Sequence, residues 1–129
     1  MSGLINKTSN FSVAETVQRL IKRIEEEKWH VFASIDHSKQ ARDKDLELRP
    51  TQVILFGNPQ LGTLLMQDQQ STAIDLPVKA LVWEDAEGNV KLTYNSVQWI
   101  KERHHLKDST AVTKIGEFIE KVCLCACQE

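Results

Sequence analysis

The chain has 129 residues, of which 41% are hydrophobic and 26% are charged, and its formal net charge is −2. This length and balance predict one globular domain, 1–129, and the small negative charge argues against a general nucleic-acid binder, which needs clustered Lys and Arg. No apolar run approaches the ~20 residues that span a bilayer, and the first residues lack a signal-peptide pattern, so we expect no membrane segment and a cytoplasmic location.

The first quarter of the chain predicts a helix followed by a strand. Apolar residues recur at helical spacing within 11–29, and Ser12 is the expected N-cap because a glutamate follows three residues later. A short strand is expected before it, in 7–11. Residues 29–36 alternate as a strand. We expect one side of this strand to carry Trp29, Val31, Ala33 and Ile35. His37 keeps the parity of that side, so it is expected to face inward.

The rest of the chain predicts alternating strands and helices. In chain order we expect a polar loop or one or two helical turns (37–48), an interior strand (49–57), a short helix (58–70), a hairpin turning at Gly88 (76–95) and two helices (96–105 and 110–122). Helices at both ends and clustered strands between them predict an α+β fold, an antiparallel sheet with helices packed on one face.

Several spaced motifs resemble the domain-of-unknown-function 302 family. They are the Asp-His pair at 36–37, Pro-Thr at 50–51, "FGNP" at 56–59, the Gly-Thr and Leu-Met that follow, and "DLP" with a lysine before a late tyrosine. The likeness covers a core of about 11–106. The C-terminal helix and cysteine-rich tail, 107–129, lie outside it, and Ser96-Val97 stand where relatives often carry Asp-Pro.

This resemblance implies a fold of the TATA-binding-protein-like class, with the order β-α-β4-α, and it implies a homodimer. The family has no established activity, so the resemblance implies architecture and no cofactor. A fold label by itself says nothing about DNA, because function lies in sites rather than in folds.

The stretch "FGNPQLGT" permits two interpretations. In one, it is a strand-to-helix corner, where glycines allow tight geometry and Pro59 starts the helix after Asn58 as its N-cap. In the other, free N–H groups at the helix start hold an anion, helped by nearby side chains. The residues of this candidate ligand site are Gly57, Asn58, Gly62 and Thr63. The stretch lacks the Gly-Lys-Ser/Thr ending of a P-loop.

Three cationic or titratable side chains are candidates to complete such a site. His37, Arg49 and Lys79 would form a small cationic pocket for a carboxylate or phosphate if they converge near the corner. A loop-bonded His37, a snorkelling Lys79 and a salt bridge from Asp75 to Lys79 or Arg49 are the structural alternatives. The pocket hypothesis predicts non-catalytic binding of a small, anionic molecule.

Two other functions stay open. An enzyme would use His37 as acid or base and Lys79 to stabilise negative charge, although the sequence shows no nucleophile motif. An interaction protein would instead expose a large apolar patch.

Two further features permit structural interpretations. His104 and His105 end a helix, where cations suit the helix dipole, and adjacent histidines make a poor bidentate metal pair. The tail carries Cys123, Cys125 and Cys127. In an extended tail these could bind a soft metal, whereas a continued helix would turn Cys125 away from the other two. Burial and a reactive tail are the alternatives to a metal.

Overall fold

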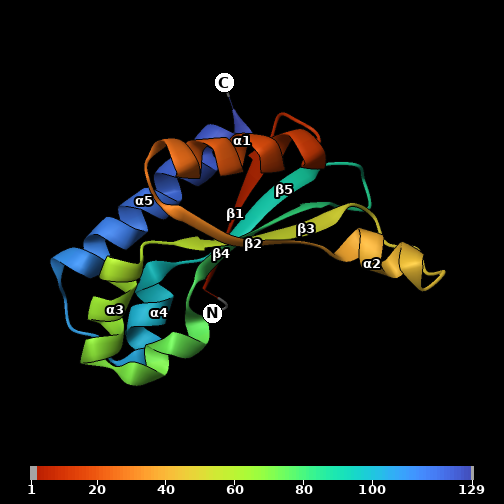
Figure 1. Cartoon of the computed structure of the whole chain (residues 1–129). Coiled ribbons are helices and arrows are strands. Elements are labelled where there is room, and N and C mark those ends of the chain that lie inside the picture. The colour runs from red at the N-terminus through yellow and green to blue at the C-terminus, as the bar shows by residue number, and fades with distance from the viewer. Residues whose placement is uncertain (1–2, 129) are drawn as a thin grey trace.

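The computed structural model describes residues 3–128 and shows an antiparallel sheet with helices on one face and at both ends (Figure 1). The strands are β1 (Leu4–Ser9), β2 (His30–Asp36), β3 (Thr51–Gly57), β4 (Val78–Glu84) and β5 (Val90–Asn95). The helices are α1 (Val13–Glu26), α2 (His37–Asp43), α3 (Pro59–Asp68), the 3₁₀ helix η1 (Gln70–Asp75), α4 (Val97–His104) and α5 (Thr110–Cys127). The α+β fold is confirmed. The TATA-binding-protein-like topology stays a prediction.

The sheet has the strand order β1-β5-β4-β3-β2, and every neighbouring pair is antiparallel. Helices α1 and α5 pack against each other and cover one face of the sheet, α1 over β2, β3 and β4 and α5 over β1. The strand residues under them are buried: Ile54, Phe56, Val78, Ala80, Val82, Val90, Leu92 and Tyr94. This covered face is the main core of the domain.

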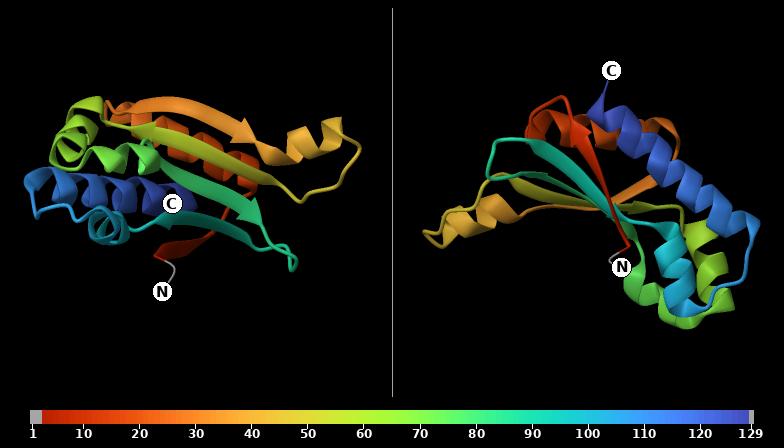
Figure 2. Two further views of the ribbon diagram at one scale, coloured as in Figure 1. Left: turned by 90° about the horizontal axis from the view of Figure 1, so that it is seen from below. Right: turned by 180° about the vertical axis from the view of Figure 1, so that it is seen from behind.

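On the opposite face, none of the described helices lies over the central strands of the sheet. Figure 2 shows this open face on the left, with the strands in front and α1 and α5 behind them. By register, its apolar side chains come from three neighbouring strands, and all are partly exposed: Ala33, Ile35, Val53, Leu55, Leu81 and Trp83. The Nε1–H of Trp83 donates to Thr93 Oγ1 (2.9 Å) on the same face.

The first and last helices are tied together at one end of the domain. The guanidinium of Arg19 in α1 donates to the carbonyl oxygens of Cys125, Ala126 and Gln128. The backbone N–H of Asn10 donates to Cys127 O at 2.8 Å. The final carbonyls of α5, which have no partner within the helix, are therefore satisfied by the N-terminal part of the chain.

A bulge in β2 overturns one strand prediction. Val31 pairs with Phe56 and faces the helices, but Ala33 pairs with Leu55 on the open face, so the register shifts between them at Phe32. A β-bulge adds one residue to one strand and reverses the alternation beyond it. The expected single side with Val31, Ala33 and Ile35 together is therefore wrong.

Candidate functional site

A pocket of about 250 Å³ opens at the corner where β3 meets α3. Its walls come from the start of β2, the corner itself, η1, the start of β4 and α5. The lining residues are Trp29, Phe32, Gly57, Asn58, Pro59, Gly62, Thr63, Met66, Ala73, Leu76, Pro77, Val78 and Ile115. No charged residue of the described part of the chain is among them. The "FGNP" corner is thus part of a concave, mainly apolar site.

Most N–H groups at the start of α3 are either already hydrogen-bonded or missing. Asn58 is the N-cap of α3, as predicted, and its Oδ1 accepts from Leu61 N–H at 3.1 Å. Pro59 has no N–H, and Gly62 N–H already donates to Asn58 O. The Thr63 hydroxyl donates to Pro59 O at 2.6 Å. The corner therefore offers an anion far fewer free donors than the sequence suggested.

The two glycines at the corner are not demanded by backbone geometry. A Cβ at Gly57 would lie 3.7 Å from Phe32, and one at Gly62 would lie 3.6 Å from Leu76, both ordinary contact distances. Neither residue is among the glycines with positive φ. Gly62 also costs helix α3 about 1 kcal/mol relative to alanine. The glycines therefore keep space open in the pocket rather than permit a turn.

Asn58 contributes a polar side chain to the lining of this pocket. Its carbonyl oxygen caps the helix, and none of the described residues accepts a hydrogen bond from its side-chain NH₂ group. An amide NH₂ has two donors, so it suits a ligand with an uncharged acceptor such as a carbonyl oxygen. Because the lining has no charged side chain and the Thr63 hydroxyl is bonded to Pro59 O, a charged ligand would lose hydration without compensation.

The structure does not bring His37, Arg49 and Lys79 together. His37 is exposed as the first residue of α2, beyond Asp36, which pairs with Gln52. Arg49 donates through Nε to Glu84 O (3.2 Å), also at this end of the sheet. The "FGNP" corner lies at the opposite end, where Gly57 pairs with His30. The expected cationic pocket, with His37 facing inward, is therefore not formed.

Lys79 lies nearer the corner, but on the face of the sheet opposite the one from which Val78 lines the pocket. It pairs with Leu55 and shares the open face with Leu81 and Trp83. Its neighbour Val78 points to the other side and lines the pocket. Lys79 is therefore a half-buried cation on an otherwise apolar sheet surface.

Asp75 has other partners than the two proposed for it. It pairs with His104 and Arg103 of α4 instead of Lys79 or Arg49. The His104 ring is buried, and its second nitrogen contacts Ser71 Oγ at 2.8 Å. The sequence indicated only a cation at the end of a helix for His104. Its position one helical turn after the buried Ile100 is the signal that the ring lies on the buried side of α4.

At the other end of the sheet, Asp36 caps α2. Its Oδ1 accepts from the Ser38 hydroxyl and from Lys39 N–H. These hydrogen bonds, that of Ser38 foremost, hold the pKa of Asp36 below its usual value. Asp36 is therefore a structural cap rather than an acid poised for catalysis.

The cysteines follow the helical alternative. Helix α5 continues through them to Cys127, so Cys123 and Cys127 are buried and Cys125 is half-buried. Burial raises the pKa of both Cys123 and Cys127. Within residues 3–128 no group of three His, Cys, Asp or Glu side chains is placed to hold a metal ion. The three sulfurs do not share one side, as an extended tail would have allowed.

Comparison with known proteins places this geometry among relatives. A crystal structure titled as an uncharacterized conserved protein DUF302 from Bacillus stearothermophilus matches with a TM-score of 0.77 and 18% identity, covering 98% of this chain and 97% of that one. At this identity the match shows the fold alone.

Closer sequence relatives are longer proteins. The chain is 45% identical over 111 residues, 86% of its length, to proteins named fluoride-specific ion channel FluC 1 from Brucella suis and from Brucella abortus. It spans 44% and 41% of them, less than half of each. None of the helices within residues 3–128 is long and apolar enough to cross a membrane.

The family follows from a match along most of the chain. The family model covers residues 5–122, beyond both ends of the expected core and up to the residue before Cys123. The chain belongs to the family described as domain of unknown function DUF302.

Proposed function

We propose that this domain binds a small, uncharged, mainly apolar molecule in the pocket at the "FGNP" corner, without catalysing a reaction on it. The observation that carries the proposal is the apolar pocket itself, which is lined by glycines at two positions where the backbone does not require them. Its ~250 Å³ lies just below the usual range of about 300–1,000 Å³ for small-molecule sites, so the ligand is small. Asn58 NH₂ would hold one acceptor atom of it.

The chemistry of the ligand differs from the anion expected from the sequence. The cations that were to hold an anion lie at the far end of the sheet or on its open face, and the pocket lining is uncharged. An aromatic ligand would find Trp29 and Phe32 in the lining. Burial of apolar surface, at about 25 cal/mol per Å², would supply most of the affinity.

A thermal-shift and ligand-observed NMR screen with uncharged aromatic and aliphatic carbonyl compounds tests the proposal. A ligand at a hundred times its dissociation constant stabilises the protein by about 2.7 kcal/mol, which shifts the midpoint by several degrees. Gly62→Leu should fill the pocket and abolish the shift, whereas Gly62→Ala adds one methyl group at ordinary contact distance and should retain it.

One further variant examines the polar group of the pocket. Asn58→Asp keeps an oxygen that caps α3 but removes the NH₂ donors, so carbonyl ligands should bind more weakly while the helix stays intact. Sodium fluoride and inorganic phosphate belong in the same screen. Hits limited to anions and lost in Lys79→Ala would overturn the apolar ligand and restore the anionic one.

Self-association is the second candidate function. In this case the domain would be an interaction module that forms a homodimer. The open face exposes apolar side chains from three adjacent strands, and beyond it α2 leads to the exposed Leu46 and Leu48. Exposed contiguous apolar surface marks interaction sites. A second copy is the proposed occupant, because the apolar side chains of this patch can pack against the same patch of another protomer, with Lys79 and Lys91 as the charged residues among those described on this face.

Sedimentation equilibrium tests the dimer. Leu81→Glu places a charge at the centre of the open face and should give a folded monomer, whereas Leu124→Glu, on the exposed side of α5, should leave the mass unchanged. A wild-type protein that stays monomeric at high concentration contradicts the interaction module. An enzyme that pairs His37 with Lys79 is not favoured, because α2 begins at the other end of the sheet from Leu55, the partner of Lys79.

A further inference from the structure

A serine, a histidine and an aspartate form one hydrogen-bonded chain between η1 and α4. Ser71 Oγ lies 2.8 Å from Nδ1 of His104, and Nε2 of the same ring lies 2.5 Å from Asp75 Oδ2. The guanidinium of Arg103 pairs with Asp75 Oδ1 at 3.1 Å. Two residues of η1 and a distant histidine of α4 are thus arranged as nucleophile, orienting carboxylate and base.

The partners assign the roles of the two ring nitrogens. A carboxylate only accepts hydrogen bonds, so in the neutral ring Nε2 carries the proton and donates to Asp75. Nδ1 then has its lone pair directed at Ser71, whose hydroxyl donates to it. The orienting carboxylate contacts Nε2 here and the serine contacts Nδ1, but either nitrogen of imidazole can act as a base once the other is held.

The three residues differ in burial: the histidine and the aspartate are buried, and the serine is exposed. His104 and Asp75 are each only 8% exposed, whereas Ser71 is exposed. The Asp75–His104 and Asp75–Arg103 contacts are enough to join η1 to α4. The serine hydroxyl adds an accessible oxygen beside a shielded base, which is the arrangement that activates a nucleophile.

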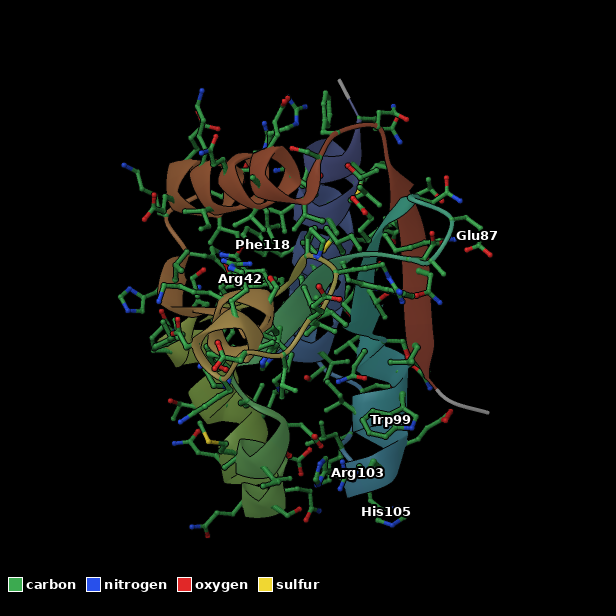
Figure 3. All side chains as sticks on the ribbon, turned by 90° about the vertical axis from the view of Figure 1, so that its right-hand side faces the viewer. Arg42, Glu87, Trp99, Arg103, His105 and Phe118 are labelled. Atoms are coloured by element: carbon green, nitrogen blue, oxygen red, sulfur yellow. The ribbon has the colours of Figure 1, made fainter. Side chains whose placement is uncertain are left out.

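The surroundings provide a cation and an aromatic ring. Arg103 uses Nη1 for Asp75, and its half-exposed guanidinium lies over the Trp99 ring at 5.2 Å. Figure 3 shows both side chains on α4, with His105 beyond them at the end of the helix. A cation near the cluster favours the negative charge that develops on an attacked carbonyl oxygen.

We propose that Ser71 is an acyl-accepting nucleophile toward small, activated aryl esters, with His104 as its base and Asp75 as the positioning residue. Ser71 Oγ attacks the carbonyl carbon, and its proton passes to His104 Nδ1. The bond from that carbon to the aryl oxygen breaks, and the aryl oxide leaves with the proton from His104. Water then hydrolyses the acyl-serine, which releases the acid and restores the hydroxyl. Ser71 does not line the corner pocket, so this activity can be tested without a ligand there.

The probe is p-nitrophenyl acetate with the full chain, followed by intact mass and peptide mapping. Wild type should show a burst of p-nitrophenolate and one acetyl group on Ser71. Ser71→Ala should remove the acetyl group and the burst, and should slow the release of p-nitrophenolate about a hundredfold or more, which is the low end of the usual contribution of general acid–base catalysis. The control is His105→Asn, which removes an exposed imidazole while keeping a residue that tolerates the left-handed backbone, φ 56°, at this position. It should react like wild type.

Two further variants separate chemistry from folding. Asp75→Asn should lower the burst rate and move the pH at which that rate is half-maximal, whereas a merely structural role would leave the shape of the profile unchanged. If a variant in the buried pair fails to fold, Ser71→Cys still reports on the base, because its thiol should be alkylated by iodoacetamide at pH 6 at least tenfold faster than Cys125. Acetylation confined to lysines or His105, or equal bursts in wild type and Ser71→Ala, would overturn the proposal.

Discussion

The two faces of the sheet come from the same strands and have different surroundings. On the covered face, side chains such as Ile54, Val82 and Leu92 are completely buried under α1 and α5. On the open face, Val53 and Leu81 are just as apolar but keep contact with solvent. Strand alternation thus predicts which residues share a face, but the helices decide which face becomes core. Apolar side chains alone do not distinguish a core face of the sheet from an exposed face.

The cysteines of α5 should show the largest difference in reactivity, between two buried positions and one half-buried position. In the native protein Cys125 should react with a disulfide reagent about a thousandfold faster than Cys123 and Cys127, because burial shields these two and raises the pKa of their thiols. Time-resolved thiol titration measures this difference. Cys125→Ser should remove the fast phase, and protection of Cys125 by Zn²⁺ would instead indicate metal binding by the tail.

A matched pair of leucines compares the faces directly. Leu92→Ala, at a completely buried position, should lower the free energy of unfolding by about 2–5 kcal/mol. Leu81→Ala, on the open face, should cost less than about 1 kcal/mol in dilute protein. Urea unfolding at two protein concentrations measures both values. A cost for Leu81→Ala that grows with concentration would show that a second copy covers this face.

Gly116 examines how tightly the covered side is packed. A Cβ at this position in α5 would lie 2.6 Å from Val97 Cγ1 of α4. Gly116→Ala should therefore destabilise the protein by about 1–2 kcal/mol, although alanine is the better helix former by about 1 kcal/mol. Adding Val97→Ala should restore the helix-propensity gain. A stabilised single variant would mean that α4 moves freely against α5.

Asp36 gives the smallest effect, at the α2 end of the sheet. Asp36→Ala should cost about 0.5–1 kcal/mol at neutral pH, because an N-cap is lost. Since hydrogen bonds hold the pKa of Asp36 below its usual value, this contribution is present above the unfolded-state pKa of about 4 and is lost as the pH falls through the lower folded-state pKa. Urea midpoints from pH 7 to 2.5 should converge for wild type and variant, and the substitution Asp36→Asn should retain part of the cap.

Local signals in the sequence predicted much of the fold. Ser12 and Asn58 cap their helices as expected, and Gly88 turns the β4–β5 hairpin with φ 84°. These features depend on a few neighbouring residues, so one sequence is enough to reveal them. The bulge at Phe32 was missed because it arises from pairing with β3, and it reversed the facing expected for the residues beyond it.

The candidate site was harder to predict, because it also depends on contacts between segments that are distant in sequence. The residues of the "FGNP" corner were found, because they are contiguous. The opposite walls, such as Leu76 and Ile115, arrive from distant elements, and no local pattern marks them. The Asp75–His104 pair joins residues 29 apart, and only the packing of η1 against α4 brings them together.

The link between Arg19 and the end of α5 has a consequence for how the chain folds. The guanidinium and its carbonyl partners are more than a hundred residues apart in sequence. The strands β2 to β5 pair with their neighbours in chain order and can form from nearby segments, but α1 cannot fully bury its apolar side until α5 packs against it. Closing so long a loop is slow, since non-local contacts are gained only after its entropy has been lost. Any folding intermediate in which α5 has not yet docked therefore leaves the apolar side of α1 incompletely covered.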